Sequence, residues 1–410
     1  MADLVLQNAR ILDTRAGVLR EGAIRVEGER IVEVADGALR HAGVREVDLR
    51  GRVLMPGLID AHVHAVITTL NLAAMQQRPA TLVSQEARLV LEAMLRRGFT
   101  SVRDAGGADW GLAEAVERGL VRGPRLFFSG HALSQTGGHG DFRPRSDDAH
   151  LCACRIFTTG FSHVADGVDA VRKAAREELR RGATQVKIMA SGGVASPTDP
   201  IWNVQYSADE MRAIVEEARG WRTYAMAHAY TPEAIRRAVE AGVRTIEHGN
   251  LIDRATADLM VRHEAFLVPT LVTYYAIDEL GRALGFPEVS QRKVKDVLER
   301  GLSSIEIARD AGLALGFGSD LLGETHDQQS RELLIRAEAE PAADVLRAAT
   351  LVNARILGRE GELGEIVPGA LADLLVVDGD PLGDLSLLQD QGKHLQLVMK
   401  AGEAFVDRLV

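Results

Sequence analysis

The chain has 410 residues, of which 46% are hydrophobic and 26% are charged, a composition typical of a globular protein with one large domain and a smaller one. Its formal net charge of −10 argues against nucleic acid or an anionic membrane surface as a partner. The first residues show no signal peptide, and no apolar run reaches the length of a membrane span. Two cysteines, Cys152 and Cys154, are too few for a disulfide framework, which suits a reducing compartment. We therefore expect a cytoplasmic protein.

The two ends of the chain share a pattern of short alternating strands separated by turn residues. Examples are GAIRVEGERIVEVADG (22–37) and VPGALADLLVVDGDP (367–381). Each end is too short to bury a sheet alone, so the pattern predicts that they pair with each other. We expect one small β-sandwich built from residues 1–55 and 367–410, beside a central domain of residues 56–366.

The central domain alternates apolar runs with amphipathic helical stretches. The predicted strands are 56–64, 99–106, 124–130, 184–192, 223–229, 244–250, 265–270 and 313–320. Helical patterns with capping signals cover 169–182, 207–220 and 231–242. Eight strands alternating with helices predict an α/β fold of the (β/α)8 TIM-barrel type. A doubly wound sheet is the alternative, but no convincing glycine-rich phosphate turn follows an early strand.

Polar residues gather on the predicted strands, mostly at their C-terminal ends, which form the catalytic rim of a barrel. His62 and His64 lie on one side of their strand, because side chains alternate along it, and such a pair can clamp zinc. The complete group of candidates is His62, His64, Lys187, His228, His248 and Asp320. Their convergence predicts a metal centre.

Simpler explanations exist for each of these residues taken alone. A histidine at a strand end is often only a hydrogen-bonded structural residue, and Asp320 could cap the following helix. Lys187 could be a paired interior lysine in the apolar run VKIM (186–189). Burying its ammonium costs several kcal/mol, by order of magnitude, unless a partner or a chemical modification removes the charge.

The motifs PGLIDAHVH (56–64), VKIMASGG (186–193), MAHAYT (226–231), IEHGN (246–250), GFGSD (316–320) and GEIVPGALADLLVVDGDP (364–381) resemble the amidohydrolase superfamily. The resemblance covers essentially the whole chain. SVRDAGGADW (101–110), SQTGGHGDFRPR (134–145) and SGGVASPTDP (191–200) resemble its binuclear Xaa-Pro dipeptidase, or prolidase-like, group. Dipeptidases for C-terminal lysine or arginine and ochratoxin-cleaving amidases lie near that group.

The resemblance implies two divalent metal ions, with Zn²⁺ expected first, although mixed nitrogen and oxygen ligands also admit cobalt, manganese or iron. It assigns His62, His64 and Asp320 to one ion and His228 and His248 to the other. Lys187, carboxylated by carbon dioxide, would bridge the two ions.

The same resemblance implies roles in catalysis. Asp320 is the expected base, which passes its proton to the departing amine, and His139 would stabilise the oxyanion. Tyr230 would contact the substrate carboxylate. Alternatively, His139 orders a glycine-rich loop and Tyr230 is a rim aromatic residue. Asp104 could support a metal ligand from behind, but it is expected first to cap a helix.

The implied activity is hydrolysis of small amides that end in a carboxylate, with Xaa-Pro dipeptides first. The expected partners are a dipeptide or N-acyl amino acid substrate and further copies of the chain in a homo-oligomer. Residues 131–165 are expected to form a lid or a subunit-contact loop.

Several alternatives stay open. They are an Xaa-Arg/Lys dipeptidase, an ochratoxin-type amidase, a cyclic amide hydrolase such as an imidazolonepropionase-like enzyme, and a non-enzymatic barrel scaffold. Imidazolonepropionase-like enzymes and mononuclear deaminases would not need Lys187. Dihydroorotase-like sites want a basic residue soon after H-x-H, where this chain has Ala65 and Val66. A degenerate scaffold would have lost ligands, and none is lost.

Overall fold

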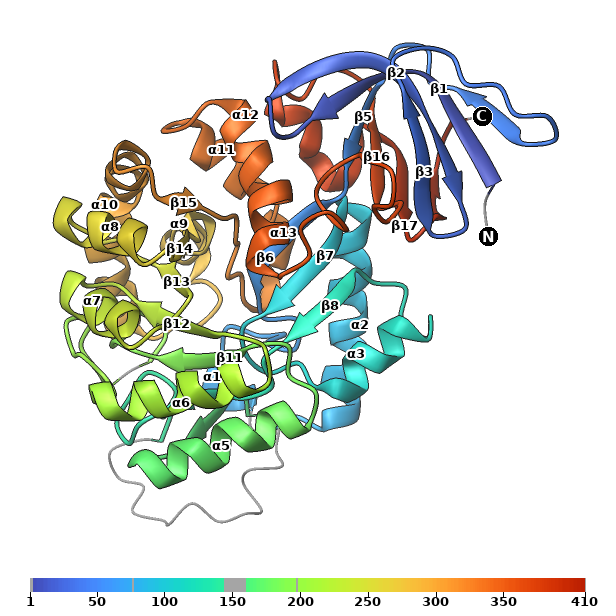
Figure 1. Ribbon diagram of the computed structural model, residues 1–410. Coiled ribbons are helices and arrows are strands. Elements are labelled where there is room, and N and C mark those ends of the chain that lie inside the picture. Colours follow the sequence, from blue (N-terminus) through green and yellow to red (C-terminus); the bar gives the residue numbers. More distant parts are fainter. Residues whose placement is uncertain (1–2, 76, 144–159, 197, 410) are drawn as a thin grey trace.

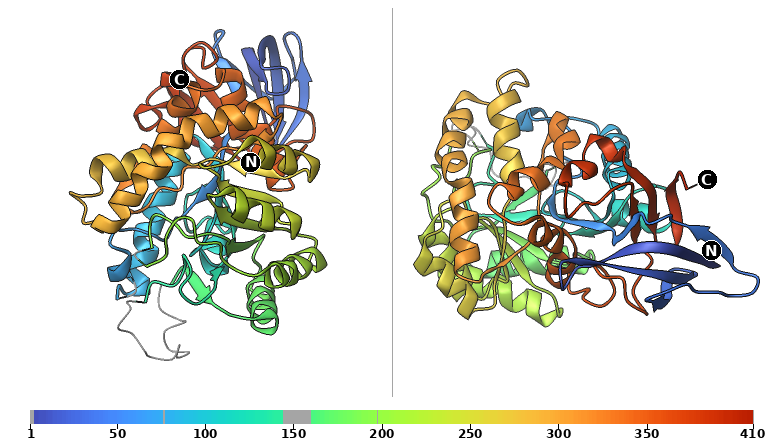
Figure 2. Two further views of the ribbon diagram at one scale, coloured as in Figure 1. Left: turned by 90° about the vertical axis from the view of Figure 1, so that its left-hand side faces the viewer. Right: turned by 90° about the horizontal axis from the view of Figure 1, so that it is seen from above.

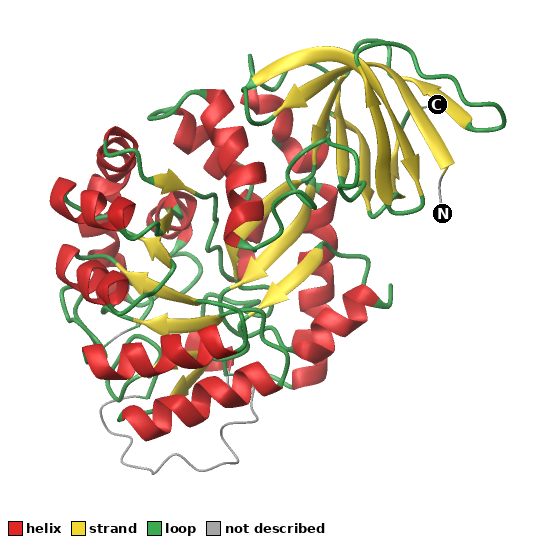
Figure 3. Cartoon of the chain, viewed as in Figure 1, coloured by secondary structure: helices red, strands yellow, loops and turns green. Residues whose placement is uncertain are grey.

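The computed structural model describes residues 3–75, 77–143, 160–196 and 198–409. A barrel-like α/β domain carries a sheet domain on one side, and both chain ends lie in that sheet (Figure 1). Helices surround the strands of the barrel, whereas few helices flank the strands of the sheet domain (Figure 3). Seen from above, the first and last strands of the chain lie together at one edge of the molecule (Figure 2).

All eight predicted barrel strands are present among the described residues. They are β6 (Leu58–Val63), β7 (Phe99–Asp104), β8 (Arg125–Phe128), β11 (Val186–Met189), β12 (Ala225–Ala229), β13 (Thr245–His248), β14 (Phe266–Val268) and β15 (Ala314–Leu315). Neighbouring strands pair in parallel within two sheets, β6-β7-β8 and β11 to β15. Backbone hydrogen bonds connect the two sheets: Thr184 donates to Phe128 and Ala61 donates to Phe317, each over 2.8 Å.

The last barrel strand is shorter than predicted, because β15 ends at Leu315 and not at Asp320. The side chain of Asn353 replaces the strand-to-strand hydrogen bonds that are missing beyond Leu315. Its amide donates to the carbonyl oxygens of Ile59 (2.6 Å) and Phe317 (2.8 Å), and its oxygen accepts from the Phe317 N–H (3.0 Å). Gly318 allows this close packing, since a Cβ there would lie 2.8 Å from Cβ of His62.

Helices follow the strands and pack outside the barrel (Figure 1). They are α1 (Leu72–Met75), α2 (Ala80–Arg96), α3 (Trp110–Glu117), α5 (Val168–Arg180), α6 (Ala208–Gly220), α7 (Pro232–Glu240), α8 (Arg254–Arg262), α9 (Leu271–Leu280), α10 (Glu288–Asp310), α11 (Arg331–Ala337), α12 (Ala342–Arg347) and α13 (Asn353–Ile356). Short 3₁₀ or π turns are η1 (Gly323–Gln328), η2 (Ala348–Val352), η3 (Leu385–Leu388) and η4 (Asp390–Gly392). The three predicted helices correspond to α5, α6 and α7, and Ser207 with Glu210 forms the capping box of α6.

The chain ends pair as the sequence predicted, and they form one sheet. Its strands are β1 (Asp3–Asp13), β2 (Val18–Glu27), β3 (Arg30–Ala35), β4 (Arg45–Asp48), β5 (Val53–Pro56), β16 (Leu374–Val377), β17 (Leu395–Lys400) and β18 (Glu403–Asp407). The described strands run in the order β18-β17-β16-β5-β1-β2-β3, with β4 beside β1. A two-layer sandwich and the domain limits at residues 55 and 366 stay predictions.

The segment 131–165 differs from the predicted loop, because its described ends are strands. β9 (Ala132–Ser134) pairs with β10 (Ser162–Val164) and with β11, so both extend the barrel sheet. The prediction missed them because each has only three residues, too few for a periodic pattern. Cys152 and Cys154 lie outside the described residues.

No helix in the described ranges combines the length and the apolar character needed to cross a lipid bilayer.

Helix α9 forms part of the cavity wall described below, and its N-terminus is held by a buried glutamate. Its N-cap residue, Thr270, makes no capping bond to the helix. Instead, Oε2 of Glu332 in α11 accepts the N–H of Val272 over 2.6 Å. Burial raises the pKa of Glu332 from its ordinary value of 4.5 to about 8. The side chain therefore stays protonated in the folded protein up to about pH 8.

This pKa predicts a pH-dependent stability. Between about pH 4.5 and about pH 8 the folded chain binds a proton at Glu332 that the unfolded chain does not, so stability falls as the pH rises through that window. Glu332→Gln has no such proton, so its melting temperature relative to wild type should rise over the same window. Calorimetry at several pH values measures this difference, with Glu338→Gln, exposed at the end of α11, as the control. A constant difference across the window would contradict the prediction.

Candidate metal centre

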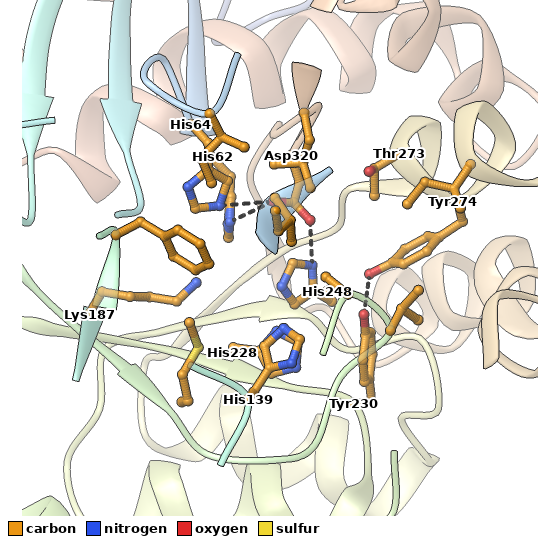
Figure 4. Close-up of a pocket in the computed structure, with 18 of the residues that line it drawn as sticks. His62, His64, His139, Lys187, His228, Tyr230, His248, Thr273, Tyr274 and Asp320 are labelled. Atoms are coloured by element: carbon orange, nitrogen blue, oxygen red, sulfur yellow. Dashed lines mark hydrogen bonds and ion pairs between the residues drawn. The ribbon is translucent and has the colours of Figure 1, made fainter. Parts of the chain in front are cut away.

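One cavity at the C-terminal ends of the barrel strands contains all eight predicted site residues among its lining (Figure 4). They are His62, His64, His139, Lys187, His228, Tyr230, His248 and Asp320. The cavity encloses about 570 Å³, opening to solvent included. The structure therefore brings together residues that are spread over more than half of the chain.

Each of the four predicted histidine ligands has one ring nitrogen fixed by the protein. The partners are Glu247 Oε2 for His62 Nδ1 (2.7 Å), the Gly106 carbonyl for His64 Nδ1 (2.9 Å), the Gly192 carbonyl for His228 Nε2 (3.2 Å) and Thr270 Oγ1 for His248 Nδ1 (2.7 Å). A ring N–H that donates to such a partner leaves the lone pair of the other nitrogen for a metal. The arrangement is that of histidines oriented as ligands.

Electron-rich atoms meet at Asp320. Its Oδ1 lies 3.2 Å from Nε2 of His62 and 3.1 Å from Nε2 of His64, and Nε2 of His62 is buried without a hydrogen bond. Donor atoms of His62, His248 and Asp320 all lie within 4.8 Å of one another. Lone pairs at such distances repel unless a proton or a cation lies between them, so these residues fit a divalent metal. Burial opposes ionisation of Asp320, yet the facing imidazoles hold its pKa well below the ordinary value.

Lys187 lies on the floor of the cavity and is 2% exposed. Its ammonium makes no ion pair with a carboxylate in the described part of the chain, and burial lowers its pKa to about 8. The lower pKa increases the neutral amine, the form that can react with carbon dioxide. Lys187 is therefore not the paired interior lysine of the simpler explanation.

A buried ion pair lies behind His62, and sequence reasoning missed it. Arg103 in β7 donates to both carboxylate oxygens of Glu247 in β13 over 3.0 Å, and both side chains are fully buried. Burial opposes the charge of Glu247, but Arg103 and His62 lower its pKa to about 2. Glu247 therefore stays ionised and fixes the His62 ring. The available signal was a charged residue inside each of two buried strands, in VRD and IEH.

Asp60 fixes the backbone near two predicted ligands and was also missed. Its carboxylate accepts the N–H of His62 (3.0 Å) and both the N–H and the hydroxyl of Ser319 (3.1 and 2.6 Å). His248 and Asp320 themselves have positive φ angles of 74° and 52°. Such backbone is costly for residues other than glycine and occurs often at functional sites.

Asp104 does not cap a helix, contrary to expectation. It accepts the backbone N–H groups of Ala65, Gly106 and Ala108 over 2.8 to 3.1 Å, while Asp109 caps α3. Asp104 thus holds the loop after β6 against the loop after β7. The carbonyl of Gly106 that fixes His64 belongs to the second of these loops.

His139 follows β9 and is held between two flat surfaces. Its ring stacks on His228 with centroids 4.2 Å apart. A Cβ at Gly193 would lie 2.1 Å from Cε1 of the ring, so only glycine leaves room there. Burial lowers the pKa of His139 to about 4, so the ring is neutral at physiological pH.

The outer wall of the cavity is uncharged. Tyr230 and Tyr274 meet through their hydroxyl groups, with Tyr274 donating over 3.0 Å. The other outer residues are Ile67, Leu72, Phe142, Phe161, Met189, Val194, Ala195, Thr273, Ile277 and Leu322. Within the described lining, Lys187 and Asp320 are the only lysine, arginine, aspartate or glutamate. Charge is therefore confined to the floor.

Comparisons with known proteins agree with this geometry. The pattern of the amidohydrolase family matches residues 53–404. An ochratoxinase from Aspergillus niger is 30% identical over 365 residues, which cover 86% of this chain and 75% of that protein. A prolidase crystallised with N-methylphosphonate-L-proline is 54% identical, with a TM-score of 0.97 and 98% and 99% of the two chains covered. A Xaa-Pro dipeptidase with bound methionine is 27% identical, with a TM-score of 0.89 and 99% and 100% covered.

Glu247 provides a test of how the ligands are oriented. Glu247→Gln removes the anion behind His62 and leaves Arg103 buried without its counter-charge. We expect metal affinity to fall by about 10- to 100-fold, as for other residues that hold a ligand, and stability to fall by about 3–5 kcal/mol. Competition with a chelator and thermal unfolding measure the two effects. Glu240→Gln, at the exposed end of α7, is the control, and unchanged metal affinity in the folded Glu247 variant would refute the role.

Proposed function

Because the chain belongs to the amidohydrolase family, we propose that it is a binuclear metal-dependent hydrolase of small amides that end in a carboxylate. Family membership and the prolidase neighbours support a hydrolase that acts on amide bonds. The preferred substrates are Xaa-Pro dipeptides and N-acyl-prolines. The observation that best supports this proposal is that one cavity contains all the candidate metal ligands and also has an uncharged outer wall.

The proposed ligands divide between two ions as the family resemblance implies. His62, His64 and Asp320 would hold one divalent ion, His228 and His248 the other, and carboxylated Lys187 would bridge them. Zn²⁺ is the first candidate because imidazole and carboxylate ligands suit it. When bound, two such ions supply a water that is acidic near neutral pH and polarise the scissile carbonyl.

The remaining steps fall to side chains of this chain. Asp320 would accept the proton of the attacking water and deliver it to the departing nitrogen, since its low pKa keeps it ionised beforehand. His139 would donate a hydrogen bond to the oxygen on which negative charge develops. Its neutral ring and its position against His228 support that role.

Substrate preference would follow from the neutral wall. No carboxylate other than Asp320 lines the described cavity, so no further group there would pair with the side chain of a C-terminal arginine or lysine. Tyr230 would bind the substrate carboxylate. Because Tyr274 donates to the Tyr230 oxygen, the Tyr230 hydrogen remains free for this bond. A proline ring suits such a wall, and its tertiary amide has no N–H to satisfy.

A second candidate is an N-acyl aromatic amino acid, the ochratoxin-type substrate. The pair Phe142 and Phe161, with ring centroids 4.9 Å apart, favours it because aromatic groups pack well against such rings. Cyclic amide hydrolysis and a scaffold role have no comparable observation in their favour. Assembly into homo-oligomers and a cytoplasmic location stay predictions.

The metal content is the first test. We expect two divalent ions per chain in the purified protein and a carboxyl group on Lys187 in a crystal structure. Lys187→Ala should lose most of the paired metal, and a short carboxylic acid in excess should restore a little activity by replacing the bridging anion. Elemental analysis and crystallography provide the measurements. One ion or fewer per chain after metal supplementation, together with an unmodified Lys187, would exclude the binuclear site.

The substrate preference is tested by charge. Ala-Pro and N-acetyl-proline should be cleaved, whereas Ala-Pro-amide should lose about tenfold or more in kcat/KM because it lacks the carboxylate, a difference of at least about 1.4 kcal/mol. Tyr230→Phe should weaken the carboxylated substrates selectively, while Tyr275→Phe, which is next to Tyr274 on α9 but outside the cavity lining, should not. Equal rates on Ala-Pro and its amide would refute the anchor. Cleavage of Xaa-Arg or Xaa-Lys, but of no Xaa-Pro substrate, would indicate the related dipeptidase specificity.

A further inference from the structure

Lys293 connects helix α10 to a loop of the cavity wall. It lies on α10, and its ammonium donates to the carbonyl oxygens of Gly193 (2.9 Å), Ser196 (2.7 Å) and Asp199 (2.5 Å). These three residues belong to the loop that follows β11, about a hundred residues earlier in the chain. Val194 and Ala195 of the same loop line the cavity.

The contact needs a lysine for a physical reason. Three carbonyl oxygens converge on one point, and their partial negative charges repel each other unless a cation lies there. An ammonium has three N–H donors on one atom and satisfies all three oxygens at once. A neutral side chain of similar length leaves the oxygens unpaired, so the loop would relax.

The same loop holds His139. Oγ of Ser196 lies 2.7 Å from Nδ1 of His139 and 3.3 Å from the carbonyl oxygen of Gly193. The hydroxyl has a single hydrogen, which it can give to only one of these acceptors. The Gly193 oxygen is the more distant acceptor and already accepts from Lys293, which weakens it further, so the hydroxyl hydrogen goes to the closer acceptor, Nδ1.

A hydroxyl that donates to Nδ1 places the ring hydrogen of neutral His139 on Nε2. Asp199, whose Oδ2 is 3.7 Å from Nδ1, would favour the opposite tautomer. That oxygen is beyond hydrogen-bond distance and already accepts from the N–H of Gly193 and from Nε2 of Gln205, each over 3.1 Å. Gln205 also accepts the backbone N–H of His139 over 2.8 Å, which fixes the position of the residue.

We propose that Lys293 is a positioning residue that, by binding three carbonyl groups, orients the Ser196 hydroxyl so that His139 presents its Nε2–H to the substrate carbonyl. The proposal rests on the proposed amide hydrolysis for its kinetic consequence. The tautomer of His139 is a property of the protein alone. It can therefore be measured even if no amide proves to be a substrate.

The main experiment compares Lys293→Met, which keeps the length of the side chain but has no donor, with Lys295→Met, an exposed lysine on the same helix. Nitrogen NMR of ¹⁵N-histidine-labelled, zinc-loaded protein reports the tautomer, with the His139 signals identified by their loss in His139→Ala. We expect the Nε2–H form in wild type and in the Lys295 variant. The Lys293 variant should lose that preference.

Kinetics provide the second readout. In Lys293→Met, kcat for N-acetyl-proline should fall by about 10- to 100-fold, with KM and metal content changed by less than about twofold. In a His139→Ala background the same substitution should cost little, because both changes act through one group. Ser196→Ala, which keeps the lysine contact, should reproduce the tautomer change and the fall in kcat.

The outcomes separate the possibilities. An unchanged tautomer in either Lys293→Met or Ser196→Ala overturns the proposal, as does an equal loss of kcat with and without His139. If Lys293→Met fails to fold, an unchanged tautomer in Ser196→Ala still overturns the proposal, since the proposed effect passes through that hydroxyl. A shifted tautomer with no hydrolysis of any amide supports the positioning role and refutes the proposed function instead.

Discussion

The buried ion pair between Arg103 and Glu247 is the interaction on which the rest of the cavity depends. It joins β7 to β13 across the barrel interior, where neither charge is solvated. Arg103 also donates to the Ala61 carbonyl (2.6 Å), so it fixes the strand that carries His62, and Glu247 fixes the ring itself. Two buried charges are costly unless each satisfies the other, and removal of either leaves the partner uncompensated. The pair is thus a strict geometric constraint on the floor of the cavity, where the candidate metal ligands lie.

The strands and the predicted ligands could be found from the sequence because both are indicated by patterns among neighbouring residues. Alternation of apolar runs with capped helices predicted eight strands, and the position of each histidine at a strand end predicted that they meet. Contacts that pair distant residues could not be found in this way. Asn353 reaches back to Ile59 and Phe317 to close the barrel, and nothing in its neighbourhood indicates that role. The strands β9 and β10 were too short to have a period.

Charged residues inside strands also show that contacts between distant residues cannot be predicted from a local pattern. VKIM, VRD and IEH each place a charge in an apolar run, and the sequence says only that each charge needs an explanation. The structure gives different ones: Arg103 and Glu247 satisfy each other, whereas Lys187 has no carboxylate in ion-pair distance within the described chain. That difference depends on strand order and side-chain length, which no single-strand pattern contains. Of these three buried charges, Lys187 is therefore the one for which a chemical modification that removes the charge would be most favourable.

The charged residues of the cavity lie on its floor, and the outer wall is neutral. Residues at the strand ends and residues of the wall therefore have different roles. The floor consists of strand ends whose donors are fixed by Glu247, Gly106, Gly192 and Thr270. The wall consists of neutral residues from loops, from α1 and α9 and from the end of β11. Single groups that lie outside the cavity lining, such as Glu332 and Lys293, hold parts of it. Loops tolerate change better than barrel strands. Changes confined to the wall therefore alter which groups fit the cavity, while the charged residues of the floor keep their positions.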